Sequence, residues 1–204
     1  LNYLKKGHQY FFDSKKEKFK LGVKYCFDDV LQISEEASIS KLDGKNDYNI
    51  KPIFIIGVPR CGSTLVEKII ASGAKYIPVG EETTIIHEFI KQKILKNESL
   101  NLDKENFQKN IIENYMKRGL IQKKSDYTFT DKSLENFFYV NLIKEIFPYA
   151  KVINCRRNPL SSIMSILKSN LPTISWAHNL EHIFKYFDIY IRKIDNFHKI
   201  RRVF

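Results

Sequence analysis

The sequence predicts an α/β fold of three layers, with helices on both faces of a mainly parallel sheet, preceded by a short helical segment. The short, continuous apolar run PIFIIG at 52–57 is typical of a strand buried on both faces, and KVINC at 151–155 is expected to be another buried strand. Segments with the apolar spacing of helices separate these runs. Strands that alternate with helices imply right-handed crossovers and parallel pairing, which produce this layered architecture.

The first part of the chain differs in pattern from the rest. Residues 1 to about 38 carry aromatic and aliphatic side chains among lysines, at spacings that fit one or two amphipathic helices. The polar stretch SKLDGKNDYN, at 40–49, is interpreted as a linker. We therefore expect an N-terminal helical segment at 1–48 and an α/β domain at 49–204.

We expect that the chain is cut at both ends. It begins at Leu1 rather than Met and stops at Phe204 inside a strand-like HKIRRVF. The helical segment is then expected to be the end of a repeat array, and the domain to be truncated at its C-terminus. No apolar run approaches the ~20 residues that span a bilayer and no signal peptide is visible, although a leader or anchor could lie outside this sequence.

The elements of the second part follow from local signals. After the strand at 52–57, Ser63 is expected to cap a helix that ends near Gly73 and carries its apolar residues on one face. The remaining elements, in chain order, are a strand at 76–79, helices at 83–96 and 104–120, a strand at 127–130, an amphipathic helix at 133–147 stopped by Pro148, a strand at 151–155, a helix from Asn158 (N-cap) and Pro159 to about 168, and a helix at 178–198.

Charge and cysteine content exclude several classes of function. The net charge of +11 attracts anions, but an excess of lysine is usually a solvated surface, so nucleic-acid binding is not expected. Cys26, Cys61 and Cys155 have no CxxC spacing and predict neither a zinc site nor a disulfide. Reduced thiols in a cytoplasmic protein are the simplest interpretation. The five histidines show no ligand spacing, and no metal site is expected.

Polar clusters follow the proposed strands, where ligands of parallel sheets bind. They are VPRCGST at 58–64, GEE at 80–82, DK at 131–132 and RRNP at 156–159. The first matches the Gly-rich turn of a phosphate-binding loop and makes the predicted fold P-loop-like, although Ser63 stands where a nucleotide triphosphatase has its Lys. Backbone N–H groups, hydroxyls and the Arg60 charge would still hold an anion, whereas the missing Lys argues against ATP or GTP hydrolysis.

The segment PIFIIGVPRCGSTLVEKIIAS resembles the 5'-phosphosulfate-binding loop of sulfotransferases that use 3'-phosphoadenosine-5'-phosphosulfate (PAPS), written PxxxGxPRSGTTLxxxxL. The chain is similar to the bacterial branch often fused to tetratricopeptide repeats and to tyrosylprotein sulfotransferases. Two positions depart from the pattern, with Cys61 for Ser and Ser63 for Thr, and neither change removes a backbone donor. The resemblance implies, with no metal required, that PAPS is bound by Arg60, Cys61, Gly62, Ser63 and Thr64.

A second patch, CRRNPLSSIMS, carries Arg157 and Ser165 eight residues apart. The resemblance implies that an Arg ending a strand and a Ser eight positions later bind the 3'-phosphate of PAPS. Without it, Ser165 is interpreted as an ordinary helix serine. Arg157 is favoured over Arg156 by its register relative to Asn158 and Pro159.

A third patch, GEETTII, resembles the tyrosylprotein sulfotransferase segment that holds the general base. Glu82 aligns with that base, whereas bacterial members favour Glu81, and a plain alternative is two solvated acids at a helix N-terminus. If neither acts, His87 is the next candidate. In TDKSLENF, Lys132 resembles the lysine that contacts the departing phosphosulfate, and Asp131 would orient it or cap a helix.

These patterns predict a sulfotransferase that moves a sulfuryl group from PAPS to an acceptor hydroxyl, with a carboxylate as general base. The acceptor could be a peptide tyrosine, a saccharide or a small molecule. The enzymatic alternative is a P-loop nucleotide-dependent kinase. The alternative from another class is a non-catalytic module that binds a nucleotide or a protein. A bacterial, cytoplasmic setting is expected.

Overall fold

We describe the fold from a computed structural model of the chain. The structure describes residues 2–40, 50–73, 75–96, 98, 101–122 and 127–201. The chain divides into two compact units, which are described separately. The helical unit comprises Leu1–Glu35, Val58–Cys61 and Arg156–Phe204, and the sheet unit comprises Glu36–Gly57 and Gly62–Cys155.

A three-stranded parallel sheet forms the centre of the sheet unit. Its strand order is β4-β2-β5, with β2 at Ile53–Gly57, β4 at Thr130–Asp131 and β5 at Lys151–Cys155. Every residue of β2 is buried, as expected for a central strand between two layers. The two predicted strands are therefore confirmed, but the expected burial of the second is wrong, because β5 is the end strand of this sheet and only its Cys155 is buried.

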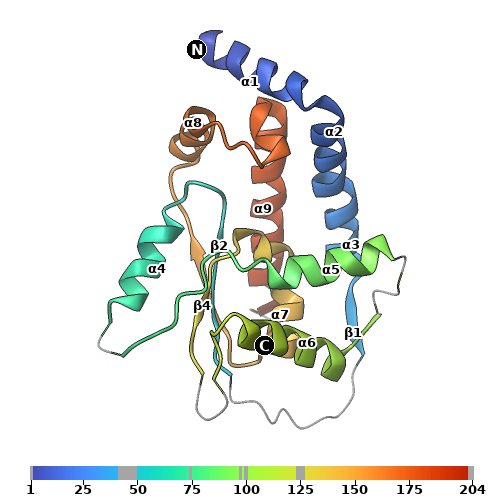
Figure 1. Cartoon of the computed structure of the whole chain (residues 1–204), viewed down its shortest axis with the longest axis vertical. Coiled ribbons are helices and arrows are strands. Elements are labelled where there is room, and N and C mark those ends of the chain that lie inside the picture. Colours follow the sequence, from blue (N-terminus) through green and yellow to red (C-terminus); the bar gives the residue numbers. More distant parts are fainter. Residues whose placement is uncertain are drawn as a thin grey trace. The chain divides into compact units, whose positions relative to one another are not determined.

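Helices lie on both sides of this sheet. Figure 1 shows α4 on one side of the strands and α5, α6 and α7 on the other. The predicted α/β fold with a mainly parallel sheet is thus confirmed. A second, two-stranded parallel sheet pairs β1 with β3. The bounds of these elements are α4 Ser63–Ala71, α5 Ile85–Leu95, α6 Lys104–Lys117, the 3₁₀ helix η2 Leu134–Tyr139, α7 Val140–Ile146, β1 Ser38–Ser40 and β3 Asn101–Asp103.

Two local predictions in the sheet unit are wrong. Gly62, not Ser63, is the N-cap of α4, with a left-handed φ of 97° that glycine adopts readily, and no side chain caps the helix. Residues 76–79 form no strand. They receive one hydrogen bond from β4, between Thr130 N–H and Pro78 O at 3.0 Å, but Pro78 has no N–H with which to continue a ladder.

The single helix predicted at 133–147 is divided into η2 and α7. The division falls at Tyr139, whose φ and ψ of −113° and 14° lie outside the helical region. Likewise, the helix predicted from residue 83 begins two residues later as α5, because Thr84 has a left-handed φ of 53°. The second difference arises where a polar side chain holds the backbone, since Thr84 N–H donates to Ser133 Oγ, and a hydrophobic pattern does not record such a bond.

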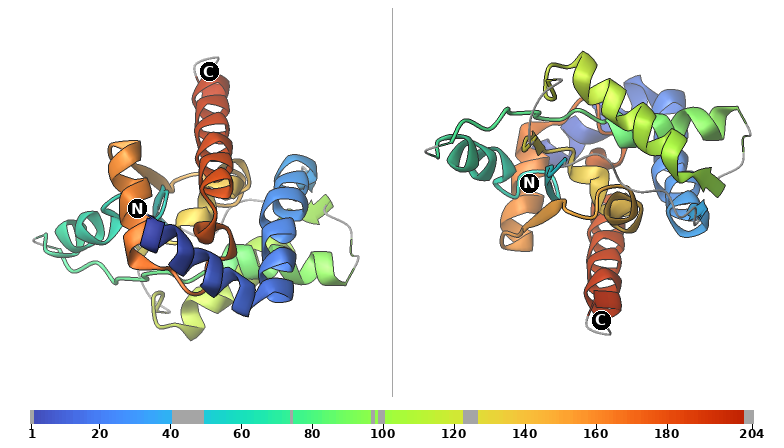
Figure 2. Two further views of the ribbon diagram at one scale, coloured as in Figure 1. Left: turned by 90° about the horizontal axis from the view of Figure 1, so that it is seen from above. Right: turned by 90° about the horizontal axis from the view of Figure 1, so that it is seen from below.

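The helical unit combines the start of the chain with its last quarter, Arg156–Phe204. Asn158 caps α8, because its side chain accepts a hydrogen bond from Ser161 N–H at 3.1 Å, and Pro159 occupies the first turn, as predicted. The long helix α9 is drawn in red in Figure 2. The elements are α1 Asn2–Ser14, α2 Lys16–Lys24, the π-helical turn η1 Tyr25–Asp29, α3 Val30–Glu36, α8 Pro159–Ser169, the 3₁₀ helix η3 Ser175–His178 and α9 Leu180–Arg201.

Aromatic side chains form the core of the helical unit. Trp176, which is buried, stacks on Tyr186 with ring centroids 3.9 Å apart. Phe19 stacks on His178, and the Nδ1 atoms of His178 and His8 lie 3.0 Å apart. These contacts join the N-terminal helices to η3 and α8.

The predicted division at residues 48 and 49 stays a prediction, since most of the linker, 41–49, lies outside the described residues. None of the helices in the described part of the chain is both long and apolar enough to cross a membrane.

Candidate functional site

In the helical unit, Val58–Cys61 forms a tight turn. Cys61 N–H donates to Val58 O at 3.3 Å, and Arg60 has a left-handed φ of 69°, which is uncommon for a residue with a side chain. Such a conformation persists only where the surroundings impose it, and it often marks a ligand-binding turn. It leaves the Arg60 side chain exposed.

In the sheet unit, the start of α4 presents free backbone donors. The first N–H that bonds back to Gly62 O is that of Leu65, at 3.0 Å. The N–H groups of Ser63 and Thr64 come before that of Leu65. They belong to the first turn of the helix, where backbone N–H groups have no acceptor within the helix. Together with the two hydroxyls and the helix dipole, these donors favour an anion.

Three predicted site residues lie together within the helical unit. Arg60 Nε donates to Ser165 Oγ at 3.0 Å, and Arg157 Nη1 donates to Arg60 O at 3.4 Å. Among the described residues, neither guanidinium lies within ion-pair distance of a carboxylate. We call Arg60, Arg157 and Ser165 the arginine cluster. Two adjacent positive charges without an acidic partner suit an anion with several oxygens.

The neighbouring arginine has a different environment. Arg156 Nη2 lies 4.0 Å from Asp195 Oδ1, a carboxylate of α9. The structure therefore separates Arg156 from the arginine cluster, although the roles of Arg156 and Arg157 stay predictions.

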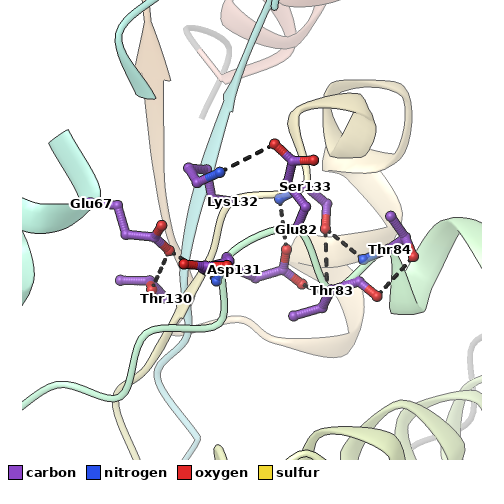
Figure 3. A network of polar contacts seen from close by, with 9 residues as sticks. Glu67, Glu82, Thr83, Thr84, Thr130, Asp131, Lys132 and Ser133 are labelled. Atoms are coloured by element: carbon purple, nitrogen blue, oxygen red, sulfur yellow. Dashed lines mark hydrogen bonds and ion pairs between the residues drawn. The ribbon is translucent and has the colours of Figure 1, made fainter. Parts of the chain in front are cut away.

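In the sheet unit, Glu82 and Lys132 form an ion pair. Glu82 Oε1 lies 3.2 Å from Lys132 Nζ, and Figure 3 shows the two charged groups facing each other. The Lys132 side chain is 7% exposed, whereas that of Glu82 is 66% exposed. The ammonium is thus held inside the unit and the carboxylate remains open to a substrate. Glu81, the other candidate base, is also exposed but contributes its backbone to the neighbouring contacts.

The backbone around Glu82 is strained and tightly held. Glu81 and Thr84 both have left-handed φ angles, 51° and 53°. Glu81 O accepts from Lys132 N–H at 2.7 Å, and Thr84 N–H donates to Ser133 Oγ at 2.8 Å. These bonds offset the cost of the unusual backbone, which is of order 1 to 3 kcal/mol for each residue.

Asp131 accepts hydrogen bonds from residues of the same region. The expectation that it orients Lys132 differs from what the structure shows, because its carboxylate accepts hydrogen bonds from other groups: Thr83 Oγ1 at 2.6 Å, Tyr115 OH at 2.6 Å, Ser133 N–H at 2.9 Å and Asn136 Nδ2 at 3.4 Å. By accepting from Ser133 N–H and Asn136 Nδ2, Asp131 holds the start of η2. This role is similar to the helix capping that the sequence also predicted. Burial, and then the Asp131 charge, raise the pKa of Tyr115 well above its usual range.

Two further residues of this region were not predicted. Glu67 of α4 is buried, and its Oε1 accepts from Thr130 Oγ1 at 2.7 Å and from Glu81 N–H at 3.2 Å. Gly80 packs directly on β4, since a Cβ there would lie 2.1 Å from Thr130 O. In the sequence, a Glu within the apolar segment LVEKII could have indicated a buried carboxylate at Glu67. A Gly directly before two acidic residues could have indicated a close backbone contact at Gly80.

Burial shifts the pKa values of two nearby side chains. Burial raises the pKa of Glu135 to about 7, and the charges of Asp131, Glu82 and Glu88 add to this effect. Burial lowers the pKa of His87, whose Nδ1 lies 3.1 Å from Tyr139 OH. The lowered pKa makes His87 a weaker proton acceptor, and its side chain is less exposed than that of Glu82.

No group of three or more His, Cys, Asp or Glu side chains that could hold a metal ion occurs among the residues described.

The chain is 29% identical over 176 residues to an uncharacterized protein of Aquifex aeolicus (strain VF5), an alignment that covers 79% of the chain. The chain spans only 23% of the length of that relative. A model of the sulfotransferase family matches residues 52–204, which contain both the start of α4 and the arginine cluster. The chain therefore belongs to the sulfotransferase family.

Proposed function

We propose that the protein transfers a sulfuryl group from PAPS to an acceptor hydroxyl. The observation that carries this proposal is the arginine cluster, in which Arg60 of the phosphate-binding turn lies against Arg157 and Ser165. Resemblance to the family assigns the turn to the 5'-phosphosulfate and the other two residues to the 3'-phosphate. PAPS carries both groups, whereas ATP lacks the 3'-phosphate.

The donor set fits this substrate. We assign the phosphosulfate to Arg60, to the neighbouring Cys61 and Gly62, and to the N–H and hydroxyl groups of Ser63 and Thr64 at the start of α4. A helix N-terminus and a guanidinium both favour a group with several anionic oxygens. The 3'-phosphate would then complete the arginine cluster.

The reaction would be an in-line displacement at sulfur. The acceptor oxygen forms a bond to sulfur while the bond between sulfur and the bridging oxygen breaks, and the acceptor proton passes to a carboxylate. The products are an O-sulfate and 3'-phosphoadenosine 5'-phosphate (PAP). Negative charge grows on the former bridging oxygen, and the Lys132 ammonium would stabilise it.

Glu82 is our candidate for the general base. Its carboxylate is exposed and faces Lys132, which supports a place beside the leaving group. Once Lys132 turns its charge to the phosphosulfate, Glu82 is released from the ion pair and can accept the proton. Glu81 remains the alternative.

The kinase alternative is weaker, because Ser63 occupies the position of the P-loop Lys. A non-catalytic binding module would use the same anion site without an acceptor. The acceptor would carry a hydroxyl on a peptide tyrosine, a saccharide or a small molecule. We also propose a bacterial, cytoplasmic setting.

Calorimetry on the intact protein tests the proposal. We expect PAP to bind without magnesium and more tightly than ATP or adenosine 5'-phosphate. Arg157→Ala should weaken PAP binding but leave adenosine 5'-phosphate binding nearly unchanged, because only PAP has the 3'-phosphate. Arg156→Ala is the matched control, since that arginine pairs with Asp195. Equal losses for both nucleotides in Arg157→Ala would contradict the assignment, and magnesium-dependent ATP binding would favour the kinase.

A further inference from the structure

Glu67 is a carboxylate buried within the sheet unit. Its residue is 2% exposed, on the inner side of α4. A buried carboxylate is costly unless it is hydrogen-bonded. Here the partners are the Thr130 hydroxyl of β4 and the Glu81 backbone N–H, both on Oε1. Glu67 therefore joins α4, which begins at the phosphate-binding loop, to the residue before Glu82.

Thr130 extends this connection by one residue. Its Oγ1 donates to Glu67 and accepts from Gly80 N–H at 3.2 Å. Gly80 lies so close to β4 that a Cβ would collide with Thr130 O. One hydroxyl and one carboxylate thus hold the backbone of Gly80 and Glu81 against the sheet.

The other end of the same segment is held independently. Thr83 Oγ1 donates to Asp131, and Thr84 N–H donates to Ser133 Oγ. Figure 3 shows Glu67 and Thr130 at one end of this network and Ser133 and Thr84 at the other, with Glu82 and Lys132 between them. The backbone of Glu82 is consequently fixed on both sides, while its side chain is exposed and paired with Lys132.

We propose that Glu67 is a positioning residue for Glu82. By accepting hydrogen bonds from Thr130 and Glu81, it sets the position of the base relative to the helix that starts at the phosphate-binding loop. This inference depends on the proposed function, in which Glu82 removes the acceptor proton. Displacement of a catalytic group by about 1 Å can cost on the order of 100-fold in rate.

Steady-state kinetics and PAP binding on the intact protein test this role. Glu67→Ala should lower kcat by on the order of 100-fold, because the base segment loses its support, and should leave the Kd for PAP unchanged. Glu67→Gln should recover most of kcat, since its amide oxygen can accept both hydrogen bonds. Glu113→Gln, an exposed glutamate on α6, is the control for the loss of one negative charge.

Hydrogen–deuterium exchange gives a readout that does not depend on activity. In Glu67→Ala the amides of residues 79–85 should exchange faster, whereas those of β2 and β5 should not change. If Glu67→Ala does not fold, Thr130→Val and Thr130→Ser replace it. The first removes the hydroxyl that joins Glu67 to Gly80 and should lower kcat, and the second keeps that hydroxyl and should restore it.

Three results would overturn the inference: an unchanged kcat in the folded Glu67→Ala protein, a Glu67→Gln enzyme as slow as Glu67→Ala, or a loss of PAP affinity that parallels the loss of kcat. Failure of the proposed function looks different. Wild-type protein would then not bind PAP, or Glu82→Gln would turn over normally. The exchange experiment would still decide whether Glu67 holds the segment.

Discussion

The raised pKa of Glu135 predicts a stability that falls with rising pH. Burial raises this pKa from 4.5 to about 7, and the charges of Asp131, Glu82 and Glu88 act in the same direction. Between these two values the unfolded chain has lost the Glu135 proton and the folded protein has kept it, so the folded state binds more protons. The free energy of unfolding therefore falls as pH increases, because Glu135 ionises in a buried environment in the folded protein and in water in the unfolded chain.

The size of the effect follows from the pKa change. At 1.36 kcal/mol for each pKa unit, ionised Glu135 lowers the free energy of unfolding by about 2 to 3 kcal/mol at pH 8, with allowance for its remaining contact with water. Glu135→Gln keeps the neutral shape and removes the titration. We expect it to match wild type near pH 4.5 and to exceed its stability by that amount at pH 8.

Urea unfolding at several pH values measures this difference. Glu113→Gln, at an exposed glutamate of α6, serves as the control for the same change of side chain. A Glu135→Gln protein whose advantage does not change between pH 4.5 and pH 8 would refute the reasoning, and so would a wild type that gains stability relative to it as pH rises.

Three other substitutions test the proposed site. Arg60→Ala should remove a charge-assisted contact worth about 1.5 to 3 kcal/mol to PAP, and unchanged affinity in calorimetry would exclude Arg60 from the site. Glu82→Gln should lower kcat by roughly 100- to 10,000-fold with little change in PAP affinity, and a dead Glu81→Gln beside an active Glu82→Gln would move the base by one residue. Lys132→Ala should slow turnover most for sulfuryl donors with poor leaving groups. A loss of rate that is the same for every leaving group would contradict the proposed role of Lys132.

The sequence predicted β2 and the start of α8 because each is marked by a strong signal within a few residues. A continuous apolar run such as Ile53–Ile56 has few alternatives to a central strand, and β2 is indeed buried along its whole length. Asn158 and Pro159 likewise gave the start of α8 from two residues. The strand expected at 76–79 was wrong, since Pro78 has no N–H to donate to a neighbouring strand.

The polar network could not be predicted because its members are distant in the chain. Thr83 and Asp131 are 48 residues apart, and neither shows a pattern that assigns it a partner. Pairing of β4 with β2 brings Asp131 to the edge of the sheet, and only then does its carboxylate have donors to accept from. Resemblance to a family supplied Glu82 and Lys132, but not the residues that hold them.

Helix α4 shows how such a network can outweigh hydrophobic periodicity. Its apolar residues form one face by sequence, yet Leu65 and Ile69 are 65% and 62% exposed while Glu67 is buried. Burial of a large aliphatic side chain is worth about 1.5 to 3 kcal/mol, so the pattern alone favours the opposite rotation of the helix. The observed rotation satisfies the Glu81 N–H and the Thr130 hydroxyl with one carboxylate. The orientation of α4, and with it the place of Ser63 and Thr64, is thus tied to the hydrogen bonds beneath the candidate base.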